Sequence, residues 1–210
     1  MRQSNIDNGM TESIYILLTD TGTLFTRLIK GFTSAPYNHA SIVLNEELQD
    51  VFSFGRKKAN NPLVAGFVRE DVYEGTFRHF PGTRCALLRL AVTAEQKAEL
   101  IRIIRNFEKD KHLYRYNLIG LVGVLFELDL HPVHSYFCSQ FVAETMRLSG
   151  IQMWDRPSSL VTPNDILKQP QFQIVYEGPL YEYPLLNRQK LGFESKGQMP
   201  PRRLRKRKIS

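Results

Sequence analysis

The stretch Tyr136-Phe137-Cys138-Ser139-Gln140-Phe141-Val142-Ala143-Glu144 places a cysteine at the start of an amphipathic helix, which we expect to end at Gly150. A helix start exposes unpaired N–H groups and the positive end of the helix dipole, and both favour thiolate over thiol. Thiolate is the form of cysteine that attacks carbonyl carbon. Cys138 is therefore a candidate nucleophile. The alternative is a small, buried side chain of the core.

A candidate base lies far upstream, in Asn38-His39-Ala40-Ser41-Ile42-Val43-Leu44. A loop rich in turn residues precedes His39, and the apolar residues after it predict a strand, so the imidazole is expected at the mouth of that strand. Such an imidazole can take the proton of Cys138 and later return it to a leaving group. The alternative is a core histidine with its hydrogen bonds satisfied.

The other hydrophobic patterns mix strands and helices without a regular β-α-β order. We expect strands over 13–18, 40–44, 48–54, 67–73, 84–92 and 172–176, and helices over 23–30, 93–109, 116–126, 138–148 and 164–168. Gly55 to Gly66 combines basic residues with Asn and Pro and predicts a surface loop. The pattern favours an α+β domain with a mostly antiparallel sheet packed against helices.

With 210 residues, the chain is expected to form one domain over 13–185, with a polar arm over 1–12 and a basic, flexible tail over 186–210. Six cationic side chains between Arg202 and Lys208 account for six of the net charge of +7, which leaves +1 elsewhere. The tail is therefore the candidate contact for an anionic partner, either nucleic acid or a membrane surface. The alternative is a solubilising end with no dedicated partner.

Several classes of protein do not fit this composition. The two cysteines are too few for a disulfide scaffold or a zinc site, and Cys85 sits in an apolar run as a structural residue. His131 and His134 flank Pro132 and have no acidic or cysteine ligand nearby, so no metal or cofactor is expected. No apolar signal segment occurs near the N-terminus, and the apolar run Leu118 to Leu128 is too short to span a membrane. We therefore expect a cytoplasmic protein without a transmembrane segment.

With both motifs in hand, the chain resembles the NlpC/P60 superfamily of papain-like cysteine hydrolases. The stretch around Cys138 is similar to the family's Cys-Ser-(Glu/Gln)-(aromatic or Leu)-Val helix start, and the stretch after His39 is similar to its histidine strand. Because the histidine precedes the cysteine, the chain resembles the circularly permuted branch, which includes YiiX-like and YebB-like proteins and the lecithin retinol acyltransferase group. The resemblance covers about Ser13 to Tyr176 and implies a permuted papain-like fold.

The resemblance also implies a third polar group, on the strand after the histidine strand, that orients the imidazole. Ser53 stands at the matching position, where the family often has His, Glu or Asp. Asp50 and Asn38 compete for this role, and an ordinary strand residue at Ser53 is the further alternative. For substrate binding, Tyr37 and Tyr136 are candidate hydroxyl donors beside the N–H of Cys138, with core packing as their alternative role, and Asn38 is a third candidate.

These residues predict a cysteine hydrolase that cleaves an amide or peptide bond through a thioacyl-enzyme, with Cys138 as nucleophile and His39 as general base. The substrate is expected to be a peptide, an amide or a lipid ester. One alternative is a lipid or amine acyltransferase of the same fold. The other is a non-catalytic module that docks on an anionic partner through its basic tail.

Overall fold

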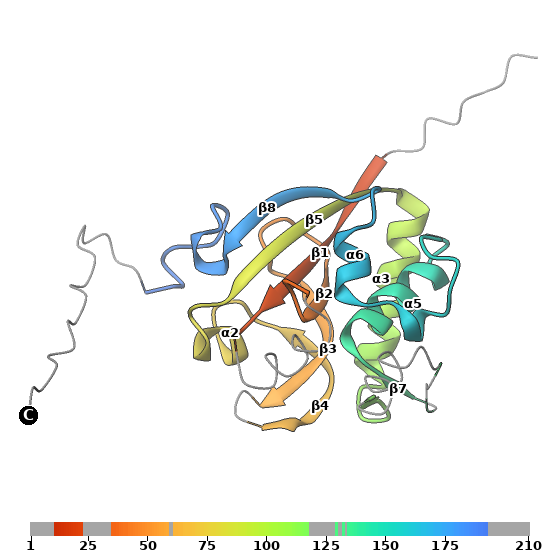
Figure 1. Cartoon of the computed structure of the whole chain (residues 1–210), viewed down its shortest axis with the longest axis horizontal. Coiled ribbons are helices and arrows are strands. Elements are labelled where there is room, and N and C mark those ends of the chain that lie inside the picture. The colour runs from red at the N-terminus through yellow and green to blue at the C-terminus, as the bar shows by residue number, and fades with distance from the viewer. Residues whose placement is uncertain are drawn as a thin grey trace, which may run out of the picture.

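The computed structural model describes residues 11–22, 35–58, 61–117, 129, 132 and 134–192. A six-stranded antiparallel sheet has the order β4-β3-β2-β1-β5-β8 (Figure 1). Its strands are β1 (Thr11–Asp20), β2 (His39–Val43), β3 (Val51–Lys58), β4 (Asn61–Glu70), β5 (Arg84–Thr93) and β8 (Gln173–Pro179). The helices are α2 (Gly75–His79), α3 (Ala94–Lys109), α5 (Cys138–Leu148) and α6 (Pro163–Leu167), with 3-10 turns at Ser158–Leu160 and Leu180–Glu182. A short parallel pair joins β6 (Arg115–Tyr116) to β7 (Ser135–Tyr136).

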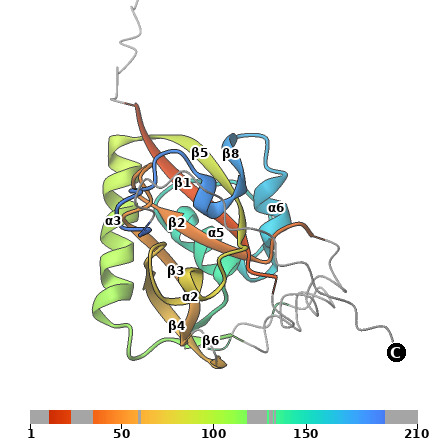
Figure 2. The same ribbon diagram turned by 90° about the vertical axis from the view of Figure 1, so that its left-hand side faces the viewer.

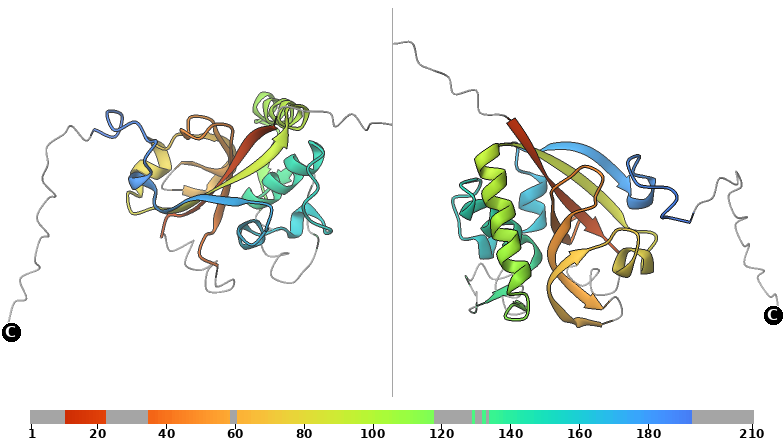
Figure 3. Two further views of the ribbon diagram at one scale, coloured as in Figure 1. Left: turned by 90° about the horizontal axis from the view of Figure 1, so that it is seen from above. Right: turned by 180° about the vertical axis from the view of Figure 1, so that it is seen from behind.

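Strand β1 lies at the centre of the sheet because its side chains are apolar on both faces. Ile14, Ile16 and Leu18 belong to one buried cluster, and Tyr15 and Leu17 belong to a second. Successive side chains of a strand point to opposite faces, so these two clusters lie on opposite sides of the sheet. Figures 1 and 3 show α3, α5 and α6 on one side, and α2 with the segment after β8 on the other.

The helical layer is formed by α3 and α5, whose apolar faces enter the first cluster. The hydroxyl of Thr93 accepts a hydrogen bond from the Gln96 N–H, and the Gln96 side chain accepts one from the Thr93 N–H, which completes the predicted capping box. Helix α5 ends before Gly150, whose φ of 77° is in the left-handed region that favours glycine. Both helices were predicted from the spacing of their apolar residues.

The packed part of the chain extends beyond the boundaries expected from the sequence. Strand β1 begins at Thr11, inside the expected N-terminal arm. Leu186 and Leu191 are each 3% exposed and pack in the second cluster, so residues after 185 also contribute to the core. The more distal tail, from 193 onward, lies outside the described residues.

The α+β class and the mostly antiparallel sheet are confirmed. The prediction of a surface loop from Gly55 to Gly66 is wrong, because 55–58 and 61–66 belong to two paired strands in which Gly55 lies opposite Gly66. The helix expected over 23–30 falls outside the described residues, as do His131 and residues 118–126 of the helix expected over 116–126. The first residue of that expected helix, Tyr116, instead ends β6. Within the described part of the chain, no helix has the length and apolar character that a membrane crossing needs.

Candidate active site

The candidate nucleophile, Cys138, lies where α5 meets strands β2 and β3. β2 and β3 pair at Ile42–Phe52 and Val43–Val51, and α5 contacts both strands (Figure 2). Toward the His39 end of β2, the Cys138 side chain lies against the main chain of that strand. Its Sγ is 4.0 Å from the carbonyl oxygen of Asn38 and also interacts with the N–H of Ala40. The first residue of α5 thus lies against the main chain at the start of β2.

The base and its partner lie on the face of the sheet opposite the helices. His39 pairs with Thr19 on β1, and Thr19 pairs with Cys85 on β5, so these side chains point to the same face of the sheet. Glu70 pairs in the same way with Val51 on β3. Cys85 and Val51 both belong to the second cluster. The helix that carries Cys138 packs in the first cluster. His39, the candidate base, therefore interacts with Cys138 of the helical layer although its strand position faces the other side of the sheet.

Glu70, at the end of β4, is the group that contacts the imidazole. Its Oε1 lies 2.9 Å from Nε2 of His39, and the two side chains are 12% and 20% exposed. This pair crosses over β3 at Gly55, where a Cβ atom would lie 3.2 Å from His39 Cε1 and 3.4 Å from Glu70 Oε1. The absence of a side chain at Gly55 is what allows the imidazole and carboxylate to meet.

Two serines surround the carboxylate. Ser41, two residues after His39 and on the same face of β2, donates a hydrogen bond of 2.6 Å to Oε2 of Glu70. Ser53 is fully buried on β3, and its hydroxyl makes no regular hydrogen bond with the described groups, although it helps to keep the pKa of Glu70 low. The orienting contact expected from Ser53 is thus made by Glu70, and Ser53 lies beside it.

The charges of these three groups reinforce one another. Burial disfavours a charged imidazole, but the Glu70 carboxylate and the hydrogen bonds to Cys138 and Glu70 outweigh burial and raise the pKa of His39 to about 10. Burial also raises the pKa of Glu70 and of Cys138. His39 acts together with Ser41 and Ser53 at Glu70, and with the N–H groups of Ala40 and Ser139 at Cys138. These contributions more than offset burial, so the pKa of each group lies below its usual value. The arrangement favours a thiolate–imidazolium pair held by a carboxylate.

The second cysteine, Cys85, shows how burial in the core changes the pKa of a thiol. Cys85 is 1% exposed, and burial raises its pKa to about 12. Cys138 is equally enclosed, at 3% exposed, yet its pKa moves in the opposite direction because His39 and the N–H groups of Ala40 and Ser139 stabilise the thiolate. The core-cysteine alternative would require burial alone to determine the pKa of Cys138. The opposite shifts of the two thiols show that it does not.

A tyrosine that the sequence did not single out lies at the sulfur. The hydroxyl of Tyr116, on β6, interacts with the Cys138 thiolate, and burial together with that thiolate raises the pKa of the phenol. The hydroxyl of Tyr37 instead donates to Oε1 of Glu177 at 2.8 Å, and the Tyr136 ring packs on Phe54 at a centroid distance of 5.1 Å. The hydroxyl donor expected from Tyr37 or Tyr136 is thus better matched by Tyr116.

The remaining candidates are held by other partners. The Asn38 side chain donates to Asp20 Oδ1 at 2.8 Å, so only its main-chain carbonyl faces Cys138. Asp50 binds Arg69 at 2.5 Å near the β2–β3 turn. One sequence signal for the missed carboxylate existed: His39 and Ser41 are two polar residues on the same face of an otherwise apolar strand, which indicates a polar partner across the sheet.

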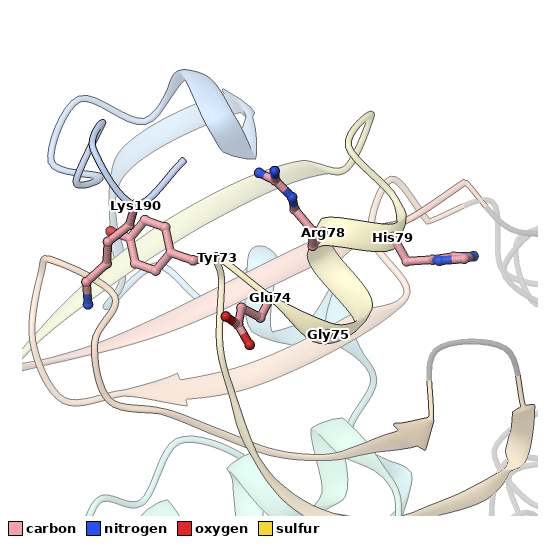
Figure 4. A pocket seen from close by; sticks show the side chains of 6 residues that line it. All are labelled: Tyr73, Glu74, Gly75, Arg78, His79 and Lys190. Atoms are coloured by element: carbon pink, nitrogen blue, oxygen red, sulfur yellow. The ribbon is translucent and has the colours of Figure 1, made fainter. Parts of the chain in front are cut away.

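A separate surface pocket of about 500 Å³ is lined by Tyr73, Glu74, Gly75, Arg78, His79 and Lys190 (Figure 4). Its charged side chains fan outward and do not converge on one point. Arg78 donates to the carbonyl of Leu191, and Lys190 lies over the Tyr73 ring. These contacts fasten the segment after β8 to α2, which is a structural role.

Comparison with known proteins adds no assignment. No protein-family model matches the chain, and no curated protein matches it in sequence. Among the described residues, no group of three or more His, Cys, Asp or Glu side chains is placed to hold a metal ion. The chemistry of the site must therefore be argued from its own geometry.

Proposed function

We propose that the protein is a papain-like cysteine hydrolase of the permuted NlpC/P60 type, which cleaves an amide or peptide bond. The proposal depends on one observation: Glu70, His39 and Cys138 form a continuous chain in which a carboxylate holds an imidazole against a thiol of lowered pKa. A core cysteine needs no such chain. The order of the elements, with the histidine strand before the cysteine helix, supports the permuted form.

In the first step, the Cys138 thiolate attacks the carbonyl carbon and forms an S–C bond, while the carbonyl electrons move to oxygen. The N–H of Cys138 has no acceptor within α5 and can bind this oxyanion together with the Tyr116 hydroxyl. Protonated His39 then gives its proton to the leaving nitrogen as the C–N bond breaks. A water molecule, deprotonated by His39, attacks the thioester and releases Cys138 and a carboxylic acid.

Acyl trapping with mass mapping tests the proposal. We expect an activated acyl ester to acylate Cys138 and the thioester to decay in water, with His39→Ala slowing acylation by about a hundredfold or more. Cys85→Ala is the matched control, because it removes the other thiol without touching the site. Acylation of Cys138 no faster than that of Cys85 would overturn the proposal and favour the non-catalytic binding module.

The same experiment separates hydrolysis from transfer. If a primary amine or a lipid alcohol shortens the life of the thioester and takes up the acyl group in preference to water, the acyltransferase alternative holds. If only water consumes the thioester, the protein is a hydrolase. Acylation by fatty esters but not by peptide esters would identify a lipid substrate.

A further inference from the structure

Ser41 contacts both members of the His39–Glu70 pair. It is fully buried on β2, where its partner in the neighbouring strand is Leu17 of the second cluster. A hydroxyl group buried beside hydrocarbon side chains costs free energy unless it is hydrogen-bonded. The Ser41 hydroxyl meets this need through Glu70, and its oxygen also lies 3.3 Å from Nε2 of His39.

The single proton of the Ser41 hydroxyl determines how these three side chains share their hydrogen bonds. Ser41 Oγ lies 2.6 Å from Oε2 of Glu70, and an ionised carboxylate can only accept. The proton of Ser41 is therefore directed to Glu70, and toward His39 the serine oxygen can only accept. Oε1 of Glu70 lies 2.9 Å from the same Nε2. Because both oxygens beside Nε2 are acceptors, this nitrogen carries a proton.

We propose that Ser41 is a positioning residue: it holds the Glu70 carboxylate against Nε2 of His39, so that this nitrogen keeps its proton and Nδ1 remains the basic one. The inference rests on the proposed function, since it concerns the base of the same reaction. If Ser41 instead donated to Nε2, that nitrogen would carry the lone pair and Nδ1 the proton. The neutral imidazole would then have no basic nitrogen for the water that hydrolyses the thioester.

Hydrolysis of the thioester tests this role, because in that step neutral His39 takes a proton from water. Cys138 is acylated with an activated acyl ester, the excess ester is removed, and the decay of the thioester is followed by mass mapping. We expect Ser41→Ala to slow this decay about three- to tenfold, the effect of one lost hydrogen bond. In a Glu70→Ala background, Ser41→Ala should slow the decay no further, because the serine acts through the carboxylate.

The matched control is Ser149→Ala, which removes another buried serine hydroxyl, bonded to the carbonyl of Met146 at the far end of α5, and should leave the decay unchanged. Equal slowing by Ser41→Ala in both backgrounds would show that the serine only supports the fold. No slowing in the otherwise wild-type protein would show that its hydroxyl is dispensable. Both results overturn the inference and leave the proposed function intact. If Cys138 is acylated no faster than Cys85, the proposed function itself fails.

A second measurement keeps Ser41 in place and covers the case in which Ser41→Ala does not fold. Alkylation of Cys138 with iodoacetamide removes the thiolate, and the nitrogen NMR shifts of the imidazole are then recorded at a pH where His39 is neutral. We expect Nε2 to be the protonated nitrogen. His39→Gln identifies the signals among the five histidines by their loss. A lone pair on Nε2 would mean that Ser41 donates to His39 and not to Glu70, and it would overturn the assignment.

Discussion

Glu70 determines which of the two catalytic side chains holds the proton. Its carboxylate is 2.9 Å from Nε2 of His39, which leaves Nδ1 as the ring nitrogen available to the sulfur. With the pKa of His39 raised to about 10 and that of Cys138 lowered, the thiolate–imidazolium form of the pair is favoured. In that form the proposed nucleophile is charged before any substrate arrives, and His39 holds the proton that the leaving group needs.

The pH dependence of alkylation tests this charge state. Cys138 loses its proton at a lowered pKa as the pH rises, so the midpoint of the rise in iodoacetamide rate should lie below about 8.5, the usual pKa of a thiol. Glu70→Gln removes the charge that raises the pKa of His39. It should move that rise to higher pH and slow labelling at pH 7 about tenfold.

Ser53→Ala is the comparison for Glu70→Gln, because Ser53 lies beside the carboxylate without a regular hydrogen bond. We expect it to shift the profile less than Glu70→Gln does. A wild-type rate that climbs steadily through pH 8.5, as for a free thiol, would contradict the lowered pKa of Cys138. A larger shift in Ser53→Ala than in Glu70→Gln would make the serine the orienting group.

Gly55 offers a steric test of the same contact. A methyl group there would lie 3.1 Å from Ser53 Oγ and 3.2 Å from His39 Cε1, closer than ordinary van der Waals contact. Gly55→Ala should push the imidazole off Glu70 and slow alkylation of Cys138 at pH 7 about tenfold, with a stability loss of about 1–3 kcal/mol.

Gly82→Ala is the matched control for Gly55→Ala, since a Cβ there meets nothing within 4 Å and the variant should label like the wild type. The urea midpoint of each variant separates loss of the contact from loss of the fold. Normal labelling of a folded Gly55→Ala protein would show that the imidazole does not depend on the gap.

The helices and strands that could be predicted are those with a recognisable pattern in a short stretch of sequence. The apolar spacing and capping box of α3, the apolar run of β5 and the cysteine helix α5 were all readable, because each depends on residues near in sequence. The adjoining ends of β3 and β4, 55–58 and 61–66, were predicted as a loop because their basic and turn residues resemble one. Glu70 lies within the strand expected over 67–73, but its role was missed, since only strand pairing and the gap at Gly55 bring that carboxylate to His39.

The start of α5 depends on a side chain that reaches backward. Gln140 is 5% exposed, and its Oε1 accepts hydrogen bonds from the Phe137 N–H at 3.3 Å and the Asn117 side chain at 3.4 Å. Gln140→Ala leaves the buried Phe137 N–H without its Gln140 acceptor, at a cost of about 1–3 kcal/mol. Because Phe137 directly precedes Cys138, the variant should also slow alkylation, which mass mapping measures.

Thr93→Ala provides a control of similar stability loss at a distance from the sulfur. It removes the N-cap of α3 and should cost about 1 kcal/mol in urea unfolding, with the alkylation rate unchanged. Equal slowing in both variants would mean that labelling tracks global stability. Slowing in Gln140→Ala alone would tie the effect to the geometry of the helix start.

For the whole molecule, the sheet separates the nucleophile from its base. The cysteine helix packs on one face with the first cluster, and the His39–Glu70 pair lies on the other. His39 nevertheless interacts with Cys138, so the reactivity of this sulfur depends on the relative position of both layers. Neither layer alone contains both Cys138 and the His39–Glu70 pair. The site could therefore be predicted only by combining two motifs that lie far apart in the sequence.

The positive charge of the chain is concentrated near its C-terminus. Six of the net seven positive charges lie between Arg202 and Lys208, so deletion of 201–210 leaves a chain with a net charge of +1. If the tail neutralises six phosphates of duplex DNA, binding should fall with salt at a log–log slope of about −5. The deletion should abolish that binding and leave alkylation of Cys138 unchanged. Binding that persists with the same slope would place the anion contact on the folded domain, where Arg56 and Lys57 are the first residues to substitute.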